Sequence, residues 1–457
     1  MKKVLLGFII ASSSFSPIYG VTLDEALSYS YENKESFKIA QQAFYKNIEA
    51  FPQALAAIAP TINAGTVGNP IPISNKSNID PTTGRVLQQD APRDSVNPIR
   101  AQVTVNQPLF NFGSGSFGIK AAQNAVQSSV SAYYSAEQQE ILNAITAYLT
   151  LIETKESYEA AKTAHQSSQV ILGSEQAKYE LGQSSLVDVS MAEASLANAE
   201  YKESGALVKY ETAKGDFTIF FGDLSPDEIS WPESDDKFLD SGVDAFKEKV
   251  MARNYDLSFA KYDTLAKKAS HRSSVAGLLP SVGLTATSTS TYSTPSSPSD
   301  SRTGYTVSIG VSAPILNLSN NSQSRTAKIA ARSAVYTFDQ TLKTTEKKVM
   351  QFWETFHSAK LSLQSAKKAV EAYQIAYDGV SNQYALGEKG LTDVLRAEQE
   401  LLDVKTQNIT TKKNYLITLY TMKSMVGDLT AKGLGLKVKY FRPEMELKKR
   451  KANVFGF

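Results

Sequence analysis

Cysteine is absent from this chain of 457 residues. Its absence excludes disulfide bonds, thiolate metal sites and a lipid attached to an N-terminal cysteine. Histidine is also scarce: the three are His165, His271 and His357, and none lies in an HExxH or similar ligand spacing. No Ser/His/Asp set suggests itself either. We therefore expect no catalytic residue, no metal site and no cofactor.

Long apolar runs and a surplus of one charge are missing as well. After the first twenty residues, no segment approaches the roughly 18 consecutive apolar residues of a transmembrane helix. The formal charge of +2 does not favour a nucleic-acid partner, which usually requires a concentrated basic surface. If the chain enters a membrane, we expect it to do so as β-strands.

The first twenty residues have the form of an export signal. Lys2 and Lys3 precede an apolar run at residues 4–11, and Ser, Pro and Gly follow before Val21. This order is typical of a secretory signal peptide. We expect residues 1–20 to be that signal peptide and the mature chain to be exported.

The most informative positive feature is an internal duplication with an offset of about 205 residues. Residues 179–193 read YELGQSSLVDVSMAE, and residues 384–398 read YALGEKGLTDVLRAE. The segments QPLFN at 107–111 and APILN at 313–317 keep almost the same offset. A fixed internal period indicates a structural unit used twice. We predict a first repeat over residues 21–225, a second over 226–430 and a C-terminal tail over 431–457.

Each repeat contains two segments in which apolar residues alternate with small or hydroxylated ones. We predict strand pairs at 58–67 and 99–107 in the first repeat, and at 281–293 and 304–313 in the second. A polar loop separates the members of each pair, and the first of these loops spans about residues 68–98. The alternation suits a strand with lipid on one face and water on the other. It also fits a soluble sheet, and four strands alone cannot close a barrel.

The rest of each repeat has helical periodicity. Residues 116–181 and 320–386 each predict a helix of about 65 residues, roughly 100 Å long. Returning helices of about 35 residues start at Leu186 and Leu391, and a helix of about 30 residues precedes each strand pair. The two shorter helices together match the long one in length. Such lengths predict a coiled-coil-like assembly in which one long helix lies beside two short ones.

Two other motifs have simpler explanations. Residues 113–118 satisfy the GxGxxG pattern, but the helix that follows is far too long for a nucleotide-binding unit, and the second copy, NLSNN, has no glycine. The glycines more simply let the chain turn from strand into helix. The basic run at residues 448–451 is interpreted as a solvated tail, because the chain is exported.

Taken together, these features resemble the TolC family of outer-membrane efflux and secretion channels. The resemblance covers essentially the whole mature sequence and rests on the export signal, the two strand and long-helix units, the junctions QPLFNFGSG and APILNLSNN, and the two YxLGxxxLxDVxxAE turns. It implies a mainly α fold with a membrane β-barrel. In a TolC-like homotrimer, each protomer would give four strands to one twelve-stranded barrel and its long coiled-coil helices to a periplasmic tunnel.

The resemblance also implies a function and a location. The chain would be the passive exit duct of a tripartite efflux or type I secretion system, not an enzyme, in the outer membrane of a Gram-negative bacterium with a large periplasmic portion. The implied partners are two further copies, a periplasmic adaptor (membrane fusion) protein, an inner-membrane transporter of RND or ABC type, and outer-membrane lipid. The sequence leaves one alternative, an exported coiled-coil structural or adhesive surface protein.

The resemblance places the family's gate just beyond the repeated turns. Its gate tyrosine falls on Tyr384, and its two aspartates fall on Asp188 and on Asp393, which would form a ring at the constriction. The latch position usually held by arginine is Lys389, which keeps the charge but loses the bidentate fork. Where the family archetype has a second acidic ring, this chain has Arg396. An Asp393–Arg396 pair at i, i+3 predicts a gate that is less selective for cations.

The resemblance further implies that the adaptor docks on the turns. Glycine is typical just past a helix C-terminus, so Gly182 and Gly387 would be explained by a turn alone. We interpret the neighbouring leucines as exposed docking residues, because a plain turn does not require them. The predicted docking residues are Leu181, Gly182, Leu186, Leu386, Gly387 and Leu391.

Overall fold

The computed structural model describes residues 22–68, 78–79, 82–83, 86–88, 99–222, 224–225, 229–240, 242–292 and 302–452. The predicted signal peptide and most of the loop at 68–98 lie outside these residues. Contacts divide the chain into two compact units. One consists of residues 1–42, 133–255 and 343–442, and the other of residues 43–132, 256–342 and 443–457. Within the described residues, no helix has both the length and the apolar character needed to cross a membrane.

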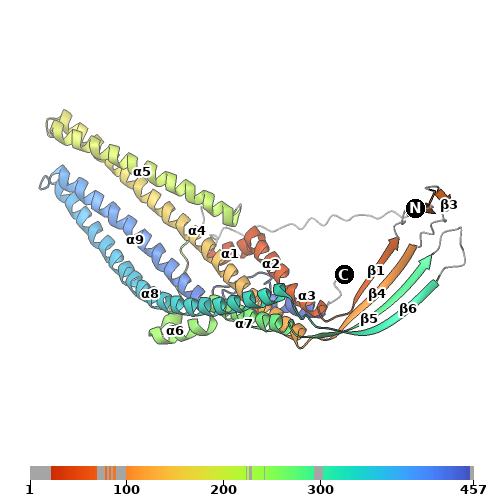
Figure 1. Cartoon of the computed structure of the whole chain (residues 1–457). Helices are drawn as coiled ribbons and strands as arrows, with labels where there is room; N and C mark the ends of the chain where they lie inside the picture. Colours follow the sequence, from red (N-terminus) through yellow and green to blue (C-terminus); the bar gives the residue numbers. More distant parts are fainter. Residues whose placement is uncertain are drawn as a thin grey trace, which may run out of the picture. The chain divides into compact units, whose positions relative to one another are not determined.

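In each of the two segments predicted as repeats, short helices, a strand pair, a long helix and a returning helix follow one another along the chain (Figure 1). The first repeat consists of α1 Leu23–Asn33, α2 Glu35–Ile48, α3 Ala50–Ala56, β1 Thr61–Gly68, β4 Ile99–Phe110, α4 Ser114–Glu180 and α5 Leu186–Phe221. The second consists of α6 Gly242–Arg253, α7 Tyr255–Ala276, β5 Ser281–Tyr292, β6 Arg302–Ser312, α8 Leu318–Ala385 and α9 Leu391–Val426. The remaining elements are β2 Asn78–Ile79, β3 Val86–Gln88, η1 Lys237–Leu239 and α10 Pro443–Ala452. The four long strands are present, and none of their ends differs from the predicted one by more than three residues.

The shorter helices differ from the sequence prediction, which had one helix in front of each strand pair. Thr22 does cap α1, and Glu25 completes a capping box with it. The helix then ends at Lys34, whose backbone is extended, and a second break at Glu49 separates α2 from α3. In the second repeat, Asn254 separates α6 from α7 and donates a hydrogen bond to the carbonyl of Met425. The breaks at Lys34 and Asn254 have no proline nearby, so periodicity alone did not reveal them. The break at Glu49 is followed by Pro52 in the first turn of α3, where a missing backbone N–H is tolerated.

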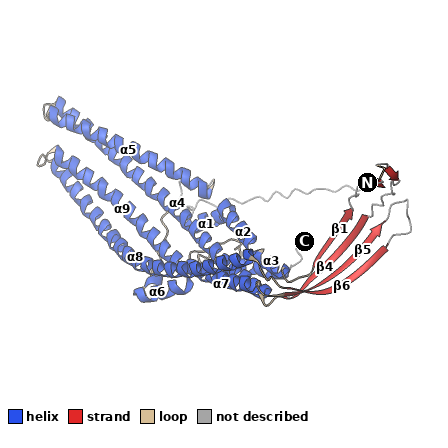
Figure 2. Ribbon diagram, in the orientation of Figure 1, coloured by secondary structure: helices blue, strands red, loops and turns tan. Residues whose placement is uncertain are grey.

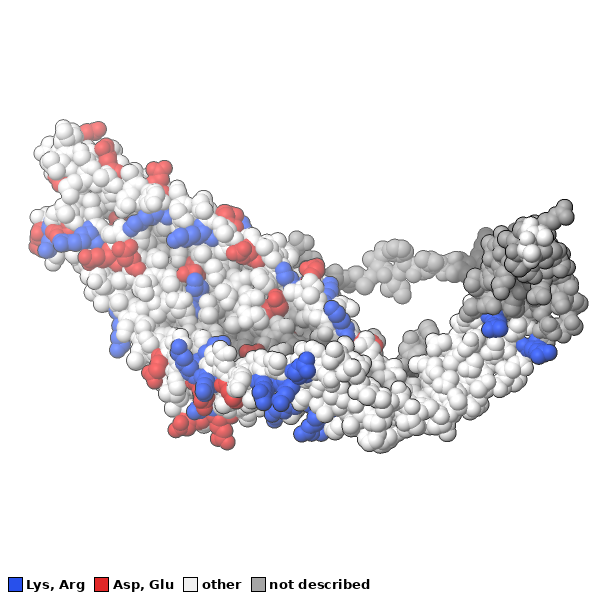
Figure 3. All heavy atoms as spheres, in the orientation of Figure 1, with Lys and Arg blue, Asp and Glu red and all other residues white. Residues whose placement is uncertain are grey.

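The four long strands lie in the second unit and form one antiparallel sheet of order β1-β4-β5-β6 (Figure 2). Among the described strands, β1 and β6 each have a partner on one side only. Along β6, exposed Tyr305, Val307, Ile309 and Val311 alternate with small or hydroxylated residues. The strands carry only two charged residues, Arg100 and Arg302, and the surface over them is uncharged in Figure 3 apart from basic side chains at one end.

Close packing explains the glycines at the junction between β4 and α4. A Cβ added to Gly115 would lie 2.3 Å from Ile58 Cγ2 and 3.0 Å from the Asn111 side chain. At the same junction, Ser114 Oγ donates to the carbonyl of Ser273 at 3.2 Å, and Ser273 Oγ donates to the carbonyl of Ser114 at 2.8 Å. Gly113 adopts φ +87°, as a turn from strand into helix requires. Gly115 permits the close approach of Ile58, which the sequence did not predict.

The first unit contains the main hydrophobic core and the parts of α4 and α8 that follow residues 133 and 343. The helix pairs α4–α5 and α8–α9 run alongside each other (Figure 1). Among the fully buried core residues are Tyr148, Phe217, Phe221, Phe246 and Leu419. Each contributes roughly 1.5–3 kcal/mol through burial, so this cluster fixes where the helices meet.

The first part of the predicted C-terminal tail packs against the first unit. Ala431 and Leu436 are buried in the core of the first unit. The backbone N–H of Ala431 donates a 2.9 Å hydrogen bond to the carboxylate of buried Glu137. Residues 443–452 then form α10. The interpretation as a solvated tail concerned residues 448–451, where Lys448 and Lys449 are exposed. The packing of residues 431–436 was not predicted, because their apolar residues have no helical or strand period that would have marked them as core.

Candidate functional site

The two repeated turns form two tips, which we define as residues 179–188 (the first tip) and residues 384–393 (the second tip). In the first tip, Gly182 adopts φ +71°, its N–H donates to the carbonyl of Tyr179 at 2.9 Å, and Gln183 N donates to the carbonyl of Lys178 at 2.8 Å. This is the hydrogen-bond pattern of a Schellman motif, which satisfies the last carbonyls of α4. A positive φ is why glycine is required at this position.

The second tip repeats this turn. Gly387 adopts φ +80°, its N–H donates to the carbonyl of Tyr384 at 3.0 Å, and Glu388 N donates to the carbonyl of Gln383 at 2.9 Å. The backbone of the two turns is therefore the same, as the matching sequences predict. The differences lie in the side chains that fasten each turn.

The start of the returning helix is capped in one tip and not in the other. In the first tip, the Asp188 N–H donates to Ser185 Oγ at 3.1 Å, and the Ser185 N–H and hydroxyl both donate to the Asp188 carboxylate. These contacts form a capping box at the N-terminus of α5. In the second tip, Gly390 occupies the capping position and provides no side-chain hydrogen bond.

The predicted gate residue Asp393 is consequently free of capping and forms an ion pair. Arg396 lies one turn further along α9, and its guanidinium is 2.5 Å from the Asp393 carboxylate. The pair predicted from the i, i+3 spacing is therefore present. Lys389 is exposed in the turn and is not among the ion-paired residues of the described chain. The five predicted gate residues do not form one cluster within a protomer.

The four predicted docking leucines are not equivalent. Leu181 is 73% exposed, Leu186 62% and Leu386 76%, as expected for side chains at a tip. Leu391 is only 4% exposed, so the expectation of an exposed residue was wrong there. Leu391 begins α9 on its buried side, whereas Leu186 begins α5 on its exposed side.

Tyr384 lies in a hydrogen-bonded cluster that the sequence did not predict. Its hydroxyl donates to the carboxylate of Glu175 and accepts from Lys178 Nζ at 2.8 Å. The Lys178 ammonium also lies 4.1 Å from the centre of the Tyr384 ring and 2.9 Å from the Glu175 carboxylate. Ser184 Oγ of the first tip donates to the other Glu175 oxygen at 2.9 Å. Glu175 therefore connects the second tip to the first; we call these four residues the tip cluster.

The tip cluster keeps Glu175 ionised although the residue is buried. Burial alone would raise the pKa of Glu175, but hydrogen bonds from Tyr384, Lys178 and Ser184 outweigh it and leave that pKa below its ordinary value. Burial likewise disfavours charged Lys178, and its bonds to Tyr384 and Glu175 outweigh that effect and raise the Lys178 pKa. Burial and the adjacent Glu175 charge raise the pKa of Tyr384, so its hydroxyl stays protonated and available as a donor.

A departure from the internal repeat marks the tip cluster in the sequence. At the offset of 205 residues, Glu175 corresponds to Val380 and Lys178 to Gln383. A charged pair in one copy that is uncharged in the other indicates a role that the second copy does not share. Tyr179, the counterpart of Tyr384, is half exposed and is not part of the cluster.

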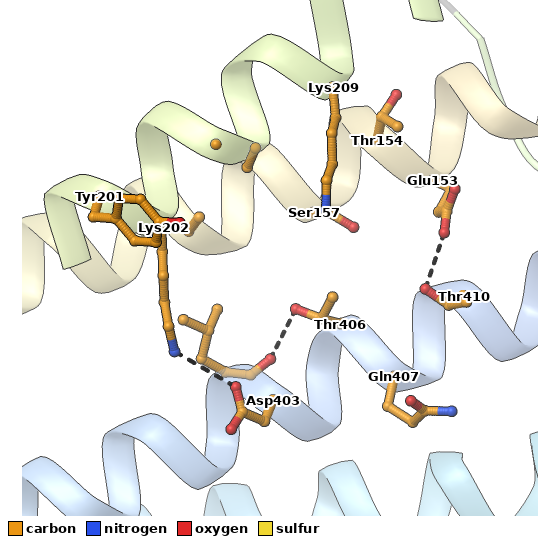
Figure 4. Close-up of a pocket in the computed structure, with 14 residues that line it drawn as sticks. Glu153, Thr154, Ser157, Tyr201, Lys202, Lys209, Asp403, Thr406, Gln407 and Thr410 are labelled. Atoms are coloured by element: carbon orange, nitrogen blue, oxygen red, sulfur yellow. Dashed lines mark hydrogen bonds and ion pairs between the residues drawn. The ribbon is translucent and has the colours of Figure 1, made fainter. Parts of the chain in front are cut away.

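Further along the helices, α4, α5 and α9 enclose an open cleft of about 560 Å³ (Figure 4). On one side Lys202 Nζ lies 3.7 Å from the Asp403 carboxylate, and on the other the Thr410 hydroxyl donates to Glu153 at 2.9 Å. Lys413 pairs with the same Glu153 at 2.7 Å. These contacts join helices of the two repeats through opposite charges. They do not assemble a nucleophile, a base and an orienting group.

The described residues contain no group of His, Asp and Glu side chains that could hold a metal ion. His165 contacts the carboxylate of Glu203 on α5. His271 and His357 lie on other helices, α7 and α8.

Comparison with known proteins agrees with the fold and the repeat. The sequence model of a family described as Outer membrane efflux protein matches residues 53–215 and 248–428. The two matched segments fall in the two repeats and together cover about three quarters of the chain. The outer membrane efflux protein BepC of Brucella suis is 24% identical over 364 residues, which are 78% of this chain and 77% of that protein.

Solved structures show the same architecture. The CmeC outer membrane channel of Campylobacter jejuni superposes with a TM-score of 0.76 and 16% identity, over 94% of this chain and 89% of that one. The outer membrane protein VceC of Vibrio cholerae superposes with a TM-score of 0.73 and 16% identity, over 89% of this chain and 96% of that one.

Proposed function

This chain belongs to the outer membrane efflux protein family, and from that premise we propose a trimeric channel that its second tip opens and closes. Members of the family are passive outer membrane channels rather than enzymes. The chain is an outer-membrane exit duct for efflux, with a large periplasmic portion. A coiled-coil adhesive surface protein is not favoured, because the match extends over both repeats.

The unpaired edges of the sheet support assembly from several copies. Within the part of the chain that the structure describes, strands β1 and β6 each leave one row of backbone N–H and C=O groups without a strand partner. Inside a membrane such groups must be paired within the protein. Pairing β6 of one copy with β1 of the next is a head-to-tail contact that closes into a ring. Three copies give twelve strands, the number that the family resemblance implies, and enclose one barrel.

The assignment of a gate to the second tip rests on the different side-chain contacts that hold the two tips. The first tip is held by its own capping box, whereas the second is held through Tyr384 to Glu175 and Lys178 of α4. Near its end, the second tip depends on the contacts of one tyrosine with α4, and loss of these contacts would free it. We assign the second tip as the moving part, Asp393 as the acidic ring that Arg396 partly neutralises, and Lys389 as a latch to a neighbouring copy.

The exposed leucines support a docking role for the tips. Leu181, Leu186 and Leu386 expose apolar side chains at the turns, where no described part of this chain covers them. The channels of this family work with an adaptor and an inner-membrane pump. We assign these three leucines, with the turn glycines Gly182 and Gly387, to contact with a periplasmic adaptor protein. Leu391 is buried at the start of α9, so we assign it to packing beneath the exposed leucines rather than to direct contact with the adaptor. The pump is assigned as an RND or ABC transporter.

Single-channel conductance of the detergent-purified protein in a planar bilayer tests this proposal. Wild type is expected to give small, steady openings, because the contacts of Tyr384 and the proposed Lys389 latch are both intact. Lys389→Ala is expected to give larger openings, since the latch charge is lost. Lys437→Ala, a lysine of the C-terminal segment away from the tips, is the matched control and should behave as wild type.

Each outcome has a distinct meaning. A pore that is identical in wild type and Lys389→Ala would retain the channel and remove Lys389 from the gate. A folded trimer with no conductance in any variant would contradict the proposed gated duct. Larger openings in Lys437→Ala as well would show that loss of any positive charge is sufficient.

A further inference from the structure

Glu398 is a buried carboxyl group on α9, in the second of the two repeated motifs. Its residue is 9% exposed, although glutamate is rarely this buried without an ionic partner. One carboxyl oxygen accepts a long hydrogen bond of 3.5 Å from Ser168 Oγ on α4. The other oxygen has no hydrogen-bond partner. Glu398 therefore lies in the contact between α4 and α9, which belong to different repeats.

The matching residue of the first repeat has a different environment. Glu193, 205 residues earlier, is exposed on α5. The same position of the motif thus carries a solvated carboxyl in one copy and a buried one in the other. Burial is not a requirement of the turn itself, because the first tip forms without it.

The surroundings of Glu398 do not neutralise its charge. The residue faces a cleft of about 400 Å³ between α4, α8 and α9. The titratable groups that line this cleft are Glu159 on α4, Tyr377 on α8 and Lys405 on α9. Lys405 is two turns from Glu398 along the same helix and forms no ion pair with it among the described contacts. Burial raises the pKa of Glu398 above its ordinary value, and the nearby hydroxyls of Ser167 and Ser168 only partly oppose this.

We propose that the protonation state of Glu398 controls how firmly α9 is held against α4, so that the second helix pair is sensitive to pH. When the carboxyl is protonated, it is neutral and is tolerated in the contact. When it is ionised, an unpaired charge is buried, and separation of the helices relieves that cost by admitting water. This inference rests on the proposed gate, because separation of α9 from α4 would release the second tip.

The direction of the pH effect follows from linkage between proton binding and helix contact. The closed contact holds the Glu398 proton more tightly than an open, solvated state does. The contact is therefore at full strength below the ordinary glutamate value of 4.5, and it weakens as the pH rises from that value through the raised pKa. Within that window, each pH unit changes the closed-to-open ratio of a protomer by up to about tenfold.

The chain contains no cysteine, which makes a direct distance measurement practical. Gln169→Cys on α4 and Glu400→Cys on α9 introduce two exposed sites for spin labels near Glu398. Labelled chains diluted with unlabelled ones in the detergent-purified protein report the distance within a protomer. We expect the long-distance population to grow as the pH rises from about 4 to about 8. Glu398→Gln should remain at the short distance throughout, because it keeps the shape without the charge.

The matched control is Glu193→Gln, which should retain the pH response of wild type. A wild-type distance that does not change with pH overturns the proposal, and this result does not depend on any variant folding. An equal pH response in Glu398→Gln overturns it as well. Conductance of the same preparations separates the two proposals: absence of a pore contradicts the gated duct, whereas a pore with an invariant α4–α9 distance contradicts only the role of Glu398.

Discussion

At the first tip, Ser185 and Asp188 cap α5 within the turn itself. At the second tip, Gly390 leaves α9 without a cap, Asp393 pairs with Arg396, and Tyr384 reaches across to Glu175. The two turns have the same backbone hydrogen bonds and the same left-handed glycine. The duplicated sequence therefore preserves the shape of the turn, while side-chain substitutions decide whether a tip is held locally or by its neighbour.

The largest expected difference concerns the first residues of the returning helices. Leu391→Ala should lower the free energy of unfolding by about 2–5 kcal/mol, because it removes a buried side chain and leaves a cavity. Leu186→Ala, at the matching position, should stay within about 0.5 kcal/mol, since its side chain is exposed. Guanidinium titration followed by circular dichroism measures both. Equal losses in the two variants would contradict the asymmetry of the tips.

The next largest effect should come from the tip cluster. Glu175→Ala removes the acceptor for Tyr384, Lys178 and Ser184, and each hydrogen bond to a buried charged group contributes about 1.5–3 kcal/mol. A loss of about 2 kcal/mol changes the closed-to-open ratio roughly thirtyfold, which open probability in single-channel records would report. Glu180→Ala, an exposed glutamate further along α4, is the control. An unchanged open probability would remove the cluster from the gate.

The tip cluster and Glu398 should respond to pH in opposite directions. Because the pKa of Glu175 is lowered, its link is fully present above the ordinary value of 4.5 and is lost as the pH falls through the lowered pKa. Glu398 instead weakens its contact as the pH rises. In Glu398→Gln, only the acid response of Glu175 should therefore remain in the conductance.

Removing the cap of α5 or adding one to α9 should change helix stability by a smaller amount. Ser185→Ala removes the cap of α5 and should cost about 1 kcal/mol, whereas Gly390→Ser should stabilise the start of α9 by a few tenths. Gly390 has φ −86°, and nothing lies within 4 Å of an added Cβ, so serine fits without strain. Hydrogen exchange of the first-turn amides measures both changes. Slower exchange in α9 of Gly390→Ser would show that capping distinguishes the tips; no change would show that Tyr384 alone does.

The smallest effect on stability, but a measurable one on selectivity, is expected for Arg396→Gln. The pair with Asp393 is largely exposed and contributes at most a few tenths of a kcal/mol to folding. Its removal leaves the acidic side chain uncompensated, so the cation-to-anion permeability ratio should rise. The reversal potential in a salt gradient measures this ratio. Lys214→Gln, which breaks another i, i+3 pair on α5, should leave it unchanged.

Features that depend on local sequence were predictable. The turn glycines indicated a left-handed residue at the end of each long helix. The alternation of residues 305–311 predicted a strand, and the i, i+3 spacing of Asp393 and Arg396 predicted their ion pair. Each is determined by residues within about one turn of helix or a few residues of strand.

Features that depend on how the repeats pack were not predictable. Glu175 and Tyr384 are 209 residues apart, and no periodicity relates them. The burial of Leu391 and Glu398 depends on which face of α9 meets α4, and the same motif in α5 leaves its counterparts exposed. The buried segment around Ala431 and Leu436 was missed for the same reason, because its contacts come from other parts of the chain.

The unpaired edges of β1 and β6 have a consequence for inheritance. A ring of three needs an intact edge from every copy. A chain that pairs through β1 but not through β6 is therefore incorporated into trimers and prevents their barrels from closing. With equal amounts of intact and defective chains, only about one ring in eight contains three intact copies. A proline placed centrally in β6 should therefore act as a dominant allele, whereas a null allele should only reduce the number of channels.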